Sequence, residues 1–121
     1  MSKRILVVED QDDNRRIMRD LLSASGYVYI EATTGDEGLA AAQREKPDLI
    51  LMDIQLPGLD GYEVTRRIKA DPALKQIPII AVTSYALSGD DEKAFAAGCD
   101  GYVTKPFSPK LLLAKIREYL K

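Results

Sequence analysis

The chain of 121 residues contains no histidine, and its single cysteine is Cys99. Without histidine the protein has no imidazole that could act as a nucleophile, a general acid or base, or a metal ligand. Cys99 cannot form a disulfide within the chain, and it has neither a histidine nor a second cysteine with which to share a metal ion. We therefore expect Cys99 to be a small residue packed beside a turn, and any chemistry to depend on other side chains.

Long runs of basic or apolar residues are also missing. The 17 basic and 19 acidic residues give a net charge of −2, and no basic run is longer than pairs such as Arg15-Arg16 and Arg66-Arg67. A nucleic-acid-binding surface is therefore not expected. No apolar run is long enough to span a membrane, and the first one, residues 5–8, is far shorter than a signal-peptide core. We expect a cytoplasmic protein without membrane contacts.

Strand-like and helix-like segments alternate along the chain, and its length is typical of one domain, here residues 1–121. The segments with strand character are residues 5–8, 27–32, 47–53, 79–82 and 101–104. Segments with helical spacing follow each of them. The pattern in the second strand indicates one wetter face and hence an edge strand, with Val28 and Ile30 on the apolar face.

Several residues mark the expected helix ends. Asp12 or Asp13 is expected to cap the first helix, Asp60 the third and Ser108 the last, where Pro109 would occupy the first helical position. The apolar positions of the first helix, which include Ile17, follow helical spacing and predict its buried face.

A strand followed by a helix, repeated five times, predicts an α/β fold. Such a chain forms a doubly wound parallel sheet with right-handed crossovers and helices on both faces. The winding reverses between the first and third strands, which places Asp10 and Asp53 side by side at the switch point.

Polar groups stand directly at the ends of four of these strands. Glu9 and Asp10 follow the first strand, Asp53 ends the third, Thr83 the fourth and Lys105 the fifth. In open parallel sheets ligands bind outside the carboxyl ends of the strands, so these side chains are expected to converge on one site. The site would hold three carboxylates, one hydroxyl and one ammonium group.

Three neighbouring carboxylates need a positive charge. At about 5 Å and an effective dielectric constant of about 20, each pair repels by roughly 3 kcal/mol. Oxygen ligands with room for water favour Mg²⁺, so Glu9, Asp10 and Asp53 are candidate ligands for it. A carboxylate can also attack phosphorus to give an acyl phosphate, which makes Asp53 the candidate nucleophile. Lys105 would supply a second cation and Thr83 a hydroxyl donor to the phosphoryl oxygens.

These residues, in this order, make the chain resemble a response-regulator receiver domain of the CheY-like family. The motifs that carry the resemblance are the acidic pair Glu9-Asp10, Asp53 within the segment 51–61, Thr83, Tyr102 and the pair Lys105-Pro106. The amino-acid sequence of residues 52–57 and 79–83, followed by Gly98-Cys99, is similar to that of DivK-like single-domain response regulators.

The resemblance implies more than the residues alone do. It implies a flavodoxin-like sheet of strand order 2-1-3-4-5, a fourth metal ligand from the backbone carbonyl of Gln55, and a cis peptide bond between Lys105 and Pro106. It also implies that Thr83 and Tyr102 switch conformation and reshape the surface of the fourth helix, fifth strand and fifth helix.

The implied function is two-component signalling. A sensor histidine kinase or a histidine phosphotransfer protein would donate a phosphoryl group to Asp53, and a downstream protein would bind the switched surface. The domain would catalyse its own phosphorylation and dephosphorylation without being a conventional enzyme. Gln55 and Tyr85 occupy positions that in the family flank the path of the attacking water, so we expect them to modulate the lifetime of the phosphoryl group.

Three alternatives share part of this pattern. A receiver domain excised from a hybrid histidine kinase or a multidomain regulator would have the same site. A phosphohydrolase with an aspartate nucleophile needs a second aspartate two residues after Asp53, where this chain has Gln55. A nucleotide-binding protein needs a glycine-rich loop after the first strand, and residues 9–14 are acidic instead.

Overall fold

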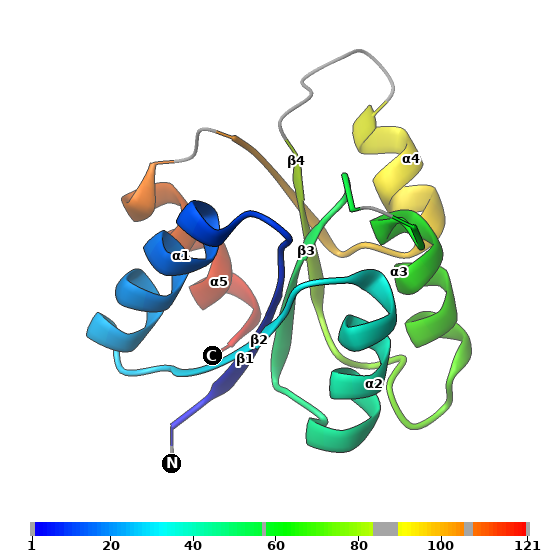
Figure 1. Cartoon of the computed structure of the whole chain (residues 1–121), viewed down its shortest axis with the longest axis horizontal. Coiled ribbons are helices and arrows are strands. Elements are labelled where there is room, and N and C mark those ends of the chain that lie inside the picture. The colour runs from blue at the N-terminus through cyan, green and yellow to red at the C-terminus, as the bar shows by residue number, and fades with distance from the viewer. Residues whose placement is uncertain (1, 57, 84–89, 106–107, 121) are drawn as a thin grey trace.

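A computed structural model of the chain describes residues 2–56, 58–83, 90–105 and 108–120. Strands and helices alternate strictly (Figure 1). The strands are β1 (Arg4–Val8), β2 (Val28–Ala32), β3 (Leu49–Asp53), β4 (Ile79–Thr83) and β5 (Gly101–Thr104). The helices are α1 (Asp12–Ala24), α2 (Gly35–Glu45), α3 (Gly61–Ala70), α4 (Asp90–Ala97) and α5 (Pro109–Tyr119).

All four strand pairings are parallel, and the strand order is β2-β1-β3-β4-β5. The predicted fold class and strand order are therefore confirmed. Strands β3 and β4 are buried along their whole length, as is β1 after its first residue. Strands covered on both faces are apolar throughout, which explains why these segments read as uninterrupted apolar runs.

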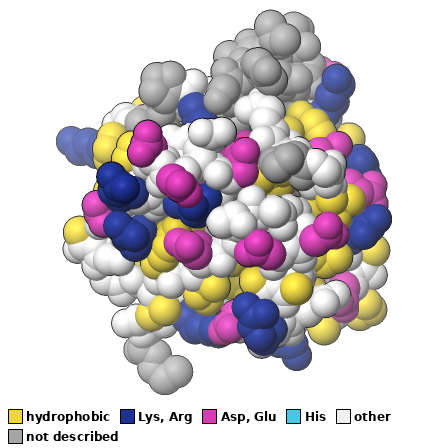
Figure 2. Space-filling model, in the orientation of Figure 1, with side chains coloured by type: hydrophobic (Ala, Val, Ile, Leu, Met, Phe, Trp, Pro, Cys, Tyr) yellow, Lys and Arg dark blue, Asp and Glu magenta, His cyan; other side chains and the backbone are white. Residues whose placement is uncertain are grey.

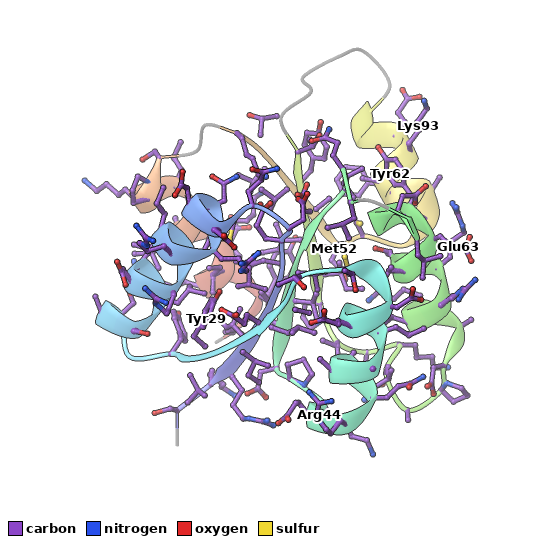
Figure 3. All side chains as sticks on the ribbon, in the orientation of Figure 1. Tyr29, Arg44, Met52, Tyr62, Glu63 and Lys93 are labelled. Carbon is purple, nitrogen blue, oxygen red and sulfur yellow. The ribbon has the colours of Figure 1, made fainter. Side chains whose placement is uncertain are left out.

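The sheet separates two hydrophobic cores. Helices α1 and α5 cover one face, and α2, α3 and α4 cover the other (Figure 1). Alternate residues of each strand point to opposite faces, so Leu49 and Leu51 pack on the α1/α5 side while Ile50 and Met52 pack on the other. Met52, labelled in Figure 3, lies between the sheet and the helices of that side.

Of the four helices whose starts are described, three begin with a side-chain cap. The hydroxyls of Thr34 and Ser108 and the carboxylate of Asp60 each accept a hydrogen bond from the backbone amide three residues later. The predicted caps at Asp60 and Ser108 are confirmed. The prediction for α1 was wrong, because Gln11 is its N-cap and makes no side-chain cap bond. Asp12 and Asp13 lie in the first turn, where their charges favour the positive end of the helix dipole.

Strand β2 pairs only with β1 among the described strands and forms one edge of the sheet, as predicted. Two apolar side chains are more exposed than their sequence pattern indicates. Val28 at the start of β2 is 43% exposed and Ile17 on α1 is 51% exposed. Val28 is the first residue of β2, and Ile17 precedes the buried Met18 of α1. None of the helices in the described ranges combines the length and apolar character that crossing a bilayer requires.

The first residue of α3, Gly61, allows this helix to start against the end of β3. A Cβ atom at position 61 would lie 2.4 Å from the backbone oxygen of Asp53 and 2.8 Å from the Cα atom of Ile54. The backbone amide of Gly61 also donates to the carbonyl of Ile54 at 3.3 Å. The absence of a side chain at Gly61 therefore sets how closely the helix approaches the segment that carries Asp53.

We predict that Gly61→Ala destabilises the protein. The new methyl group would meet backbone atoms, which cannot rotate away, so either α3 or the end of β3 must shift. Overpacking of this kind costs roughly 1–3 kcal/mol. Urea unfolding followed by circular dichroism should show this loss, and a variant as stable as the wild type would contradict the close approach.

Candidate functional site

The carboxyl ends of the strands meet along one edge of the sheet, which is the upper edge in Figure 1. The register pairs Val8 of β1 with Met52 of β3, and Asp53 of β3 with Val82 of β4. The residues that end or follow these strands are therefore neighbours. The predicted convergence of the strand ends is observed.

Three carboxylates gather at this edge. Glu9 and Asp53 are almost fully buried, with exposed fractions of 0% and 3%, while Asp10 is half-buried. Each of the three offers an oxygen that lies within 4.8 Å of the other two. Three close carboxylates, two of them shielded from water, form a strongly negative site.

The ammonium group of Lys105 lies inside this acidic cluster. Its Nζ atom is 2.6 Å from Oε1 of Glu9 and 3.5 Å from Oδ2 of Asp53. The backbone amide of Lys105 donates to the carbonyl of Thr83 at 2.6 Å, which ties the end of β5 to the end of β4. Within the described residues, every buried side-chain nitrogen and oxygen has a hydrogen-bond partner. The cluster is thus held together by an internal cation.

The two buried acids, Glu9 and Asp53, differ in their pKa values. Loss of water around Asp53, together with its hydrogen bond to Glu9 and the charge of Glu9, raises the pKa of Asp53 to about 7. Burial also acts to raise the pKa of Glu9, but the hydrogen bond from Asp53 and the nearby Lys105 hold that pKa below its usual value. Below about pH 7 the pair therefore retains one proton, carried mainly on Asp53.

Gln55, two residues after Asp53, contacts both β3 and β4. Its backbone amide donates to Oδ1 of Asp53 at 3.0 Å, and its side-chain Nε2 donates to Oγ1 of Thr83 at 2.6 Å. Thr83 is buried at this point, with an exposed fraction of 2%. Sequence reasoning selected Gln55 and Thr83 separately, but it did not reveal the bond between them, since that bond depends on the path of the loop after β3.

Arg15 of α1 is a site residue that sequence reasoning missed. Its Nη1 donates to the backbone carbonyl of Glu9 at 2.9 Å, and its guanidinium also contacts the carboxylate of Asp12. Only 14% of the Arg15 side chain is exposed. Arg15 therefore anchors the segment that carries the two acids Glu9 and Asp10. Nothing in the sequence distinguishes it from its neighbour Arg16.

The remaining predicted site residues are only partly described. Tyr102 lies on β5, is half-buried and packs against the core on the α2–α4 side. Tyr85 and Pro106 lie outside the described residues, and with them the expected cis bond of the pair Lys105-Pro106. The roles assigned to these three residues stay predictions.

The carboxylate cluster can hold a metal ion. Its ligand atoms are all oxygens, they lie close together, and half-buried Asp10 keeps one side of the cluster open. In the structure the Lys105 ammonium lies against the two buried carboxylates, whose charge a cation would also neutralise. The donor set therefore fits a hard divalent cation.

Comparison with known proteins agrees with this geometry. A family model of the response regulator receiver domain matches residues 5–117. The polar-differentiation response regulator DivK of Brucella ovis is 46% identical over 120 residues, which cover 99% of this chain and 98% of that protein. The solved structure of the chemotaxis protein CheY4 of Vibrio cholerae has a TM-score of 0.93 at 28% identity. The match covers 98% of this chain and 99% of that one.

A further solved structure is the receiver domain of a sensor histidine kinase from Pseudomonas aeruginosa, with a magnesium ion coordinated in its active-site cleft. It has a TM-score of 0.92 at 37% identity, over 99% of this chain and 98% of that one. The chain belongs to the response regulator receiver family of two-component signalling proteins. Within that family it is DivK-like, with the similarity extending along nearly all of both sequences.

The buried acid pair leads to a prediction about stability. We expect Asp53→Asn to stabilise the metal-free protein at pH 7–8 by on the order of 2–4 kcal/mol, because an amide does not ionise in this buried position. The pKa of Asp53 rises from 3.8 to about 7 on folding, so the folded state binds more protons than the unfolded state between these values. The contribution of Asp53 to wild-type stability should therefore fall from pH 4 to pH 7, and the advantage of the variant should grow over the same range.

Urea unfolding at a series of pH values measures this difference. Asp20→Asn is a matched control, because Asp20 on α1 has 71% of its side chain exposed and loses the same charge. The control should follow the wild-type pH profile. An Asp53→Asn variant whose stability differs from that of the wild type by the same amount at pH 4 and pH 8 would show that Asp53 ionises normally.

Proposed function

We propose that Asp53 is the residue that receives the phosphoryl group, with Lys105 and Thr83 as its catalytic partners. The observation that carries the proposal is the position of the Asp53 carboxylate, buried at the end of the central strand β3 and 3.5 Å from the Lys105 ammonium. In the transfer, an Asp53 oxygen forms a bond to phosphorus while the bond between phosphorus and the histidine nitrogen of the donor breaks. Phosphoryl transfer depends mainly on positioning and on stabilising charge, and this site supplies both.

Asp53 must lose its proton before it attacks. Because the pKa of Asp53 is raised to about 7 by burial and by Glu9, a substantial fraction is already ionised at cellular pH. Lys105 can then turn from Glu9 toward the incoming phosphoryl oxygens, and the Thr83 hydroxyl can donate a hydrogen bond to another of them. Both residues would thus stabilise charge that is distributed over the phosphoryl oxygens.

We propose Mg²⁺ as the metal of the site. Glu9, Asp10 and Asp53 would hold it through carboxylate oxygens, and Gln55 through its backbone carbonyl. When bound, Mg²⁺ neutralises charge on the acceptor and on the phosphoryl oxygens. The choice of Mg²⁺ is supported by the oxygen-only donor set and by the magnesium ion in the related receiver from Pseudomonas aeruginosa.

The proposed partners are a protein that donates the phosphoryl group and a downstream protein that binds the phosphorylated domain. A sensor histidine kinase or a histidine phosphotransfer protein would deliver the phosphoryl group. Acidic and basic side chains are interspersed over the face seen in Figure 2, and the net charge is only −2, which favours protein partners over nucleic acid.

The proposed output surface lies on α4, β5 and α5. A groove of about 400 Å³ runs between β5 and α5 and is lined in part by Tyr102 and Leu111. Leu111 is 70% exposed and Phe95 of α4 is 50% exposed, so apolar side chains are available to a partner. Tyr102 connects this surface to the site, since it lies on β5, whose end carries Lys105.

We propose that the protein works as a single receiver domain, as the nearly full coverage of the DivK relatives suggests. A receiver within a hybrid kinase is the second candidate, because the related Pseudomonas aeruginosa domain belongs to a sensor histidine kinase. Sequencing the native open reading frame beyond both ends of the chain would distinguish the two.

The phosphorylation site can be tested by mass. Wild-type protein incubated with acetyl phosphate and Mg²⁺ should gain one phosphoryl group, and Asp53→Asn should gain none. Asp20→Asn, which changes an exposed carboxylate of α1, should be labelled like the wild type. Equal labelling of the Asp53→Asn variant would refute the assignment.

The metal site can be tested by titration. We expect Asp10→Asn to weaken Mg²⁺ binding by about tenfold or more, because a neutral amide replaces a charged oxygen ligand. Asp13→Asn is the matched control, since Asp13 is an exposed acid in the first turn of α1. It should bind Mg²⁺ as the wild type does. If the Asp10 and Asp13 variants lose the same amount of affinity, general charge rather than coordination explains the binding.

A further inference from the structure

Gln55 joins the proposed phosphoryl acceptor to the hydroxyl that would contact the phosphoryl group. Its backbone amide donates to Oδ1 of Asp53 at 3.0 Å, while its side-chain amide donates to Oγ1 of Thr83 at 2.6 Å. These two contacts come from one residue on the loop after β3. The side chain of Gln55 therefore has a defined partner, and that partner ends the neighbouring strand β4.

The backbone of Thr83 is fixed, so its side chain is the part that can turn. Thr83 is the last residue of β4, and its carbonyl accepts the Lys105 amide at 2.6 Å. Its side chain is branched at Cβ, so χ1 rotation exchanges the hydroxyl for the methyl group. A contact that selects the χ1 rotamer of Thr83 therefore decides where the hydroxyl stands.

The direction of the hydrogen bond matters for chemistry. A threonine hydroxyl has one hydrogen to donate and two lone pairs that accept. Because Nε2 of Gln55 donates to Oγ1, it occupies a lone pair and does not use the hydroxyl hydrogen. Thr83 borders the acceptor, since Val82 just before it pairs with Asp53 across the sheet.

We propose that Gln55 is a positioning residue that selects the rotamer of Thr83 and so sets where its hydroxyl stands relative to a phosphoryl oxygen on Asp53. The inference rests on the proposed role of Asp53. It gives the Gln55 side chain a task separate from its backbone carbonyl, which is the proposed metal ligand. Gln55 thus acts through Thr83 and not by contact with the phosphoryl group.

Beryllofluoride, which mimics a phosphoryl group on a carboxylate, tests this role at saturating Mg²⁺. Gln55→Leu keeps similar size but removes the donor, and we expect about three- to tenfold weaker beryllofluoride binding. Its Mg²⁺ affinity is measured separately, so that Mg²⁺ is saturating for each variant. Gln43→Leu is the matched control, because Gln43 is exposed on α2, and its beryllofluoride affinity should not change.

Two further variants separate positioning from a general structural effect. In a Thr83→Val background, Gln55→Leu should cause no additional loss, because the hydroxyl that it positions is gone. Gln55→Glu can only accept a hydrogen bond, so it would draw the Thr83 hydroxyl hydrogen toward itself. It should weaken beryllofluoride binding more than Gln55→Leu does, and the loss that remains in the Thr83→Val background is the part due to its charge.

A measurement without any phosphoryl mimic keeps the two proposals apart. Three-bond NMR couplings of Thr83 should show one χ1 rotamer in the ligand-free wild type and averaging in Gln55→Leu. The positioning role is overturned if Gln55→Leu keeps the single rotamer, binds beryllofluoride as tightly as the wild type or more tightly, or loses equal affinity with and without Thr83. If the wild type binds no beryllofluoride with Mg²⁺, the role of Asp53 fails, and the NMR result still decides whether Gln55 orders Thr83.

Discussion

The structure depends on how it accommodates two acids, Glu9 and Asp53, that its parallel sheet buries side by side. Their mutual repulsion and loss of water would be costly for a domain of this size, whose total stability is about 5–15 kcal/mol. The ammonium group of Lys105, 2.6 Å from Glu9, offsets part of this cost, and the raised pKa of Asp53 allows a proton to offset more of it below about pH 7. The Gln55 amide contact to Asp53 and the Lys105 amide contact to Thr83 lie at the same edge of the sheet.

The fold explains why these groups meet. Parallel strands end at the same edge, so Glu9 after β1, Asp53 on β3, Thr83 on β4 and Lys105 after β5 are neighbours, although Glu9 and Lys105 are 96 residues apart in the chain. Gly61 lets α3 begin directly against the end of β3. The positions of these side chains are therefore set by strands and helices rather than by loops alone.

Sequence reasoning could predict the features that depend on local pattern. The apolar runs of β1, β3 and β4 identify strands buried on both faces, and polar residues at their ends identify the site. It could not predict the contact of Arg15 with the Glu9 carbonyl or of Gln55 with Thr83, because both depend on side-chain direction and loop path. The exposure of Ile17 was missed for a related reason, since helical spacing does not show where the neighbouring core ends.

The contacts of the site differ in how readily they can be exchanged. The Lys105 ammonium balances the negative charge of Glu9 and Asp53 through its side chain alone, so a divalent cation placed among the same carboxylates would share this role without rebuilding the fold. The Arg15 contact to the Glu9 backbone and the Lys105 amide bond to Thr83 are backbone ties that hold the strand ends in place. A signalling site needs both kinds of contact. Exchangeable charges allow the chemical state to change, and the fixed ties keep the ends of β1, β4 and β5 in place when a charge is exchanged.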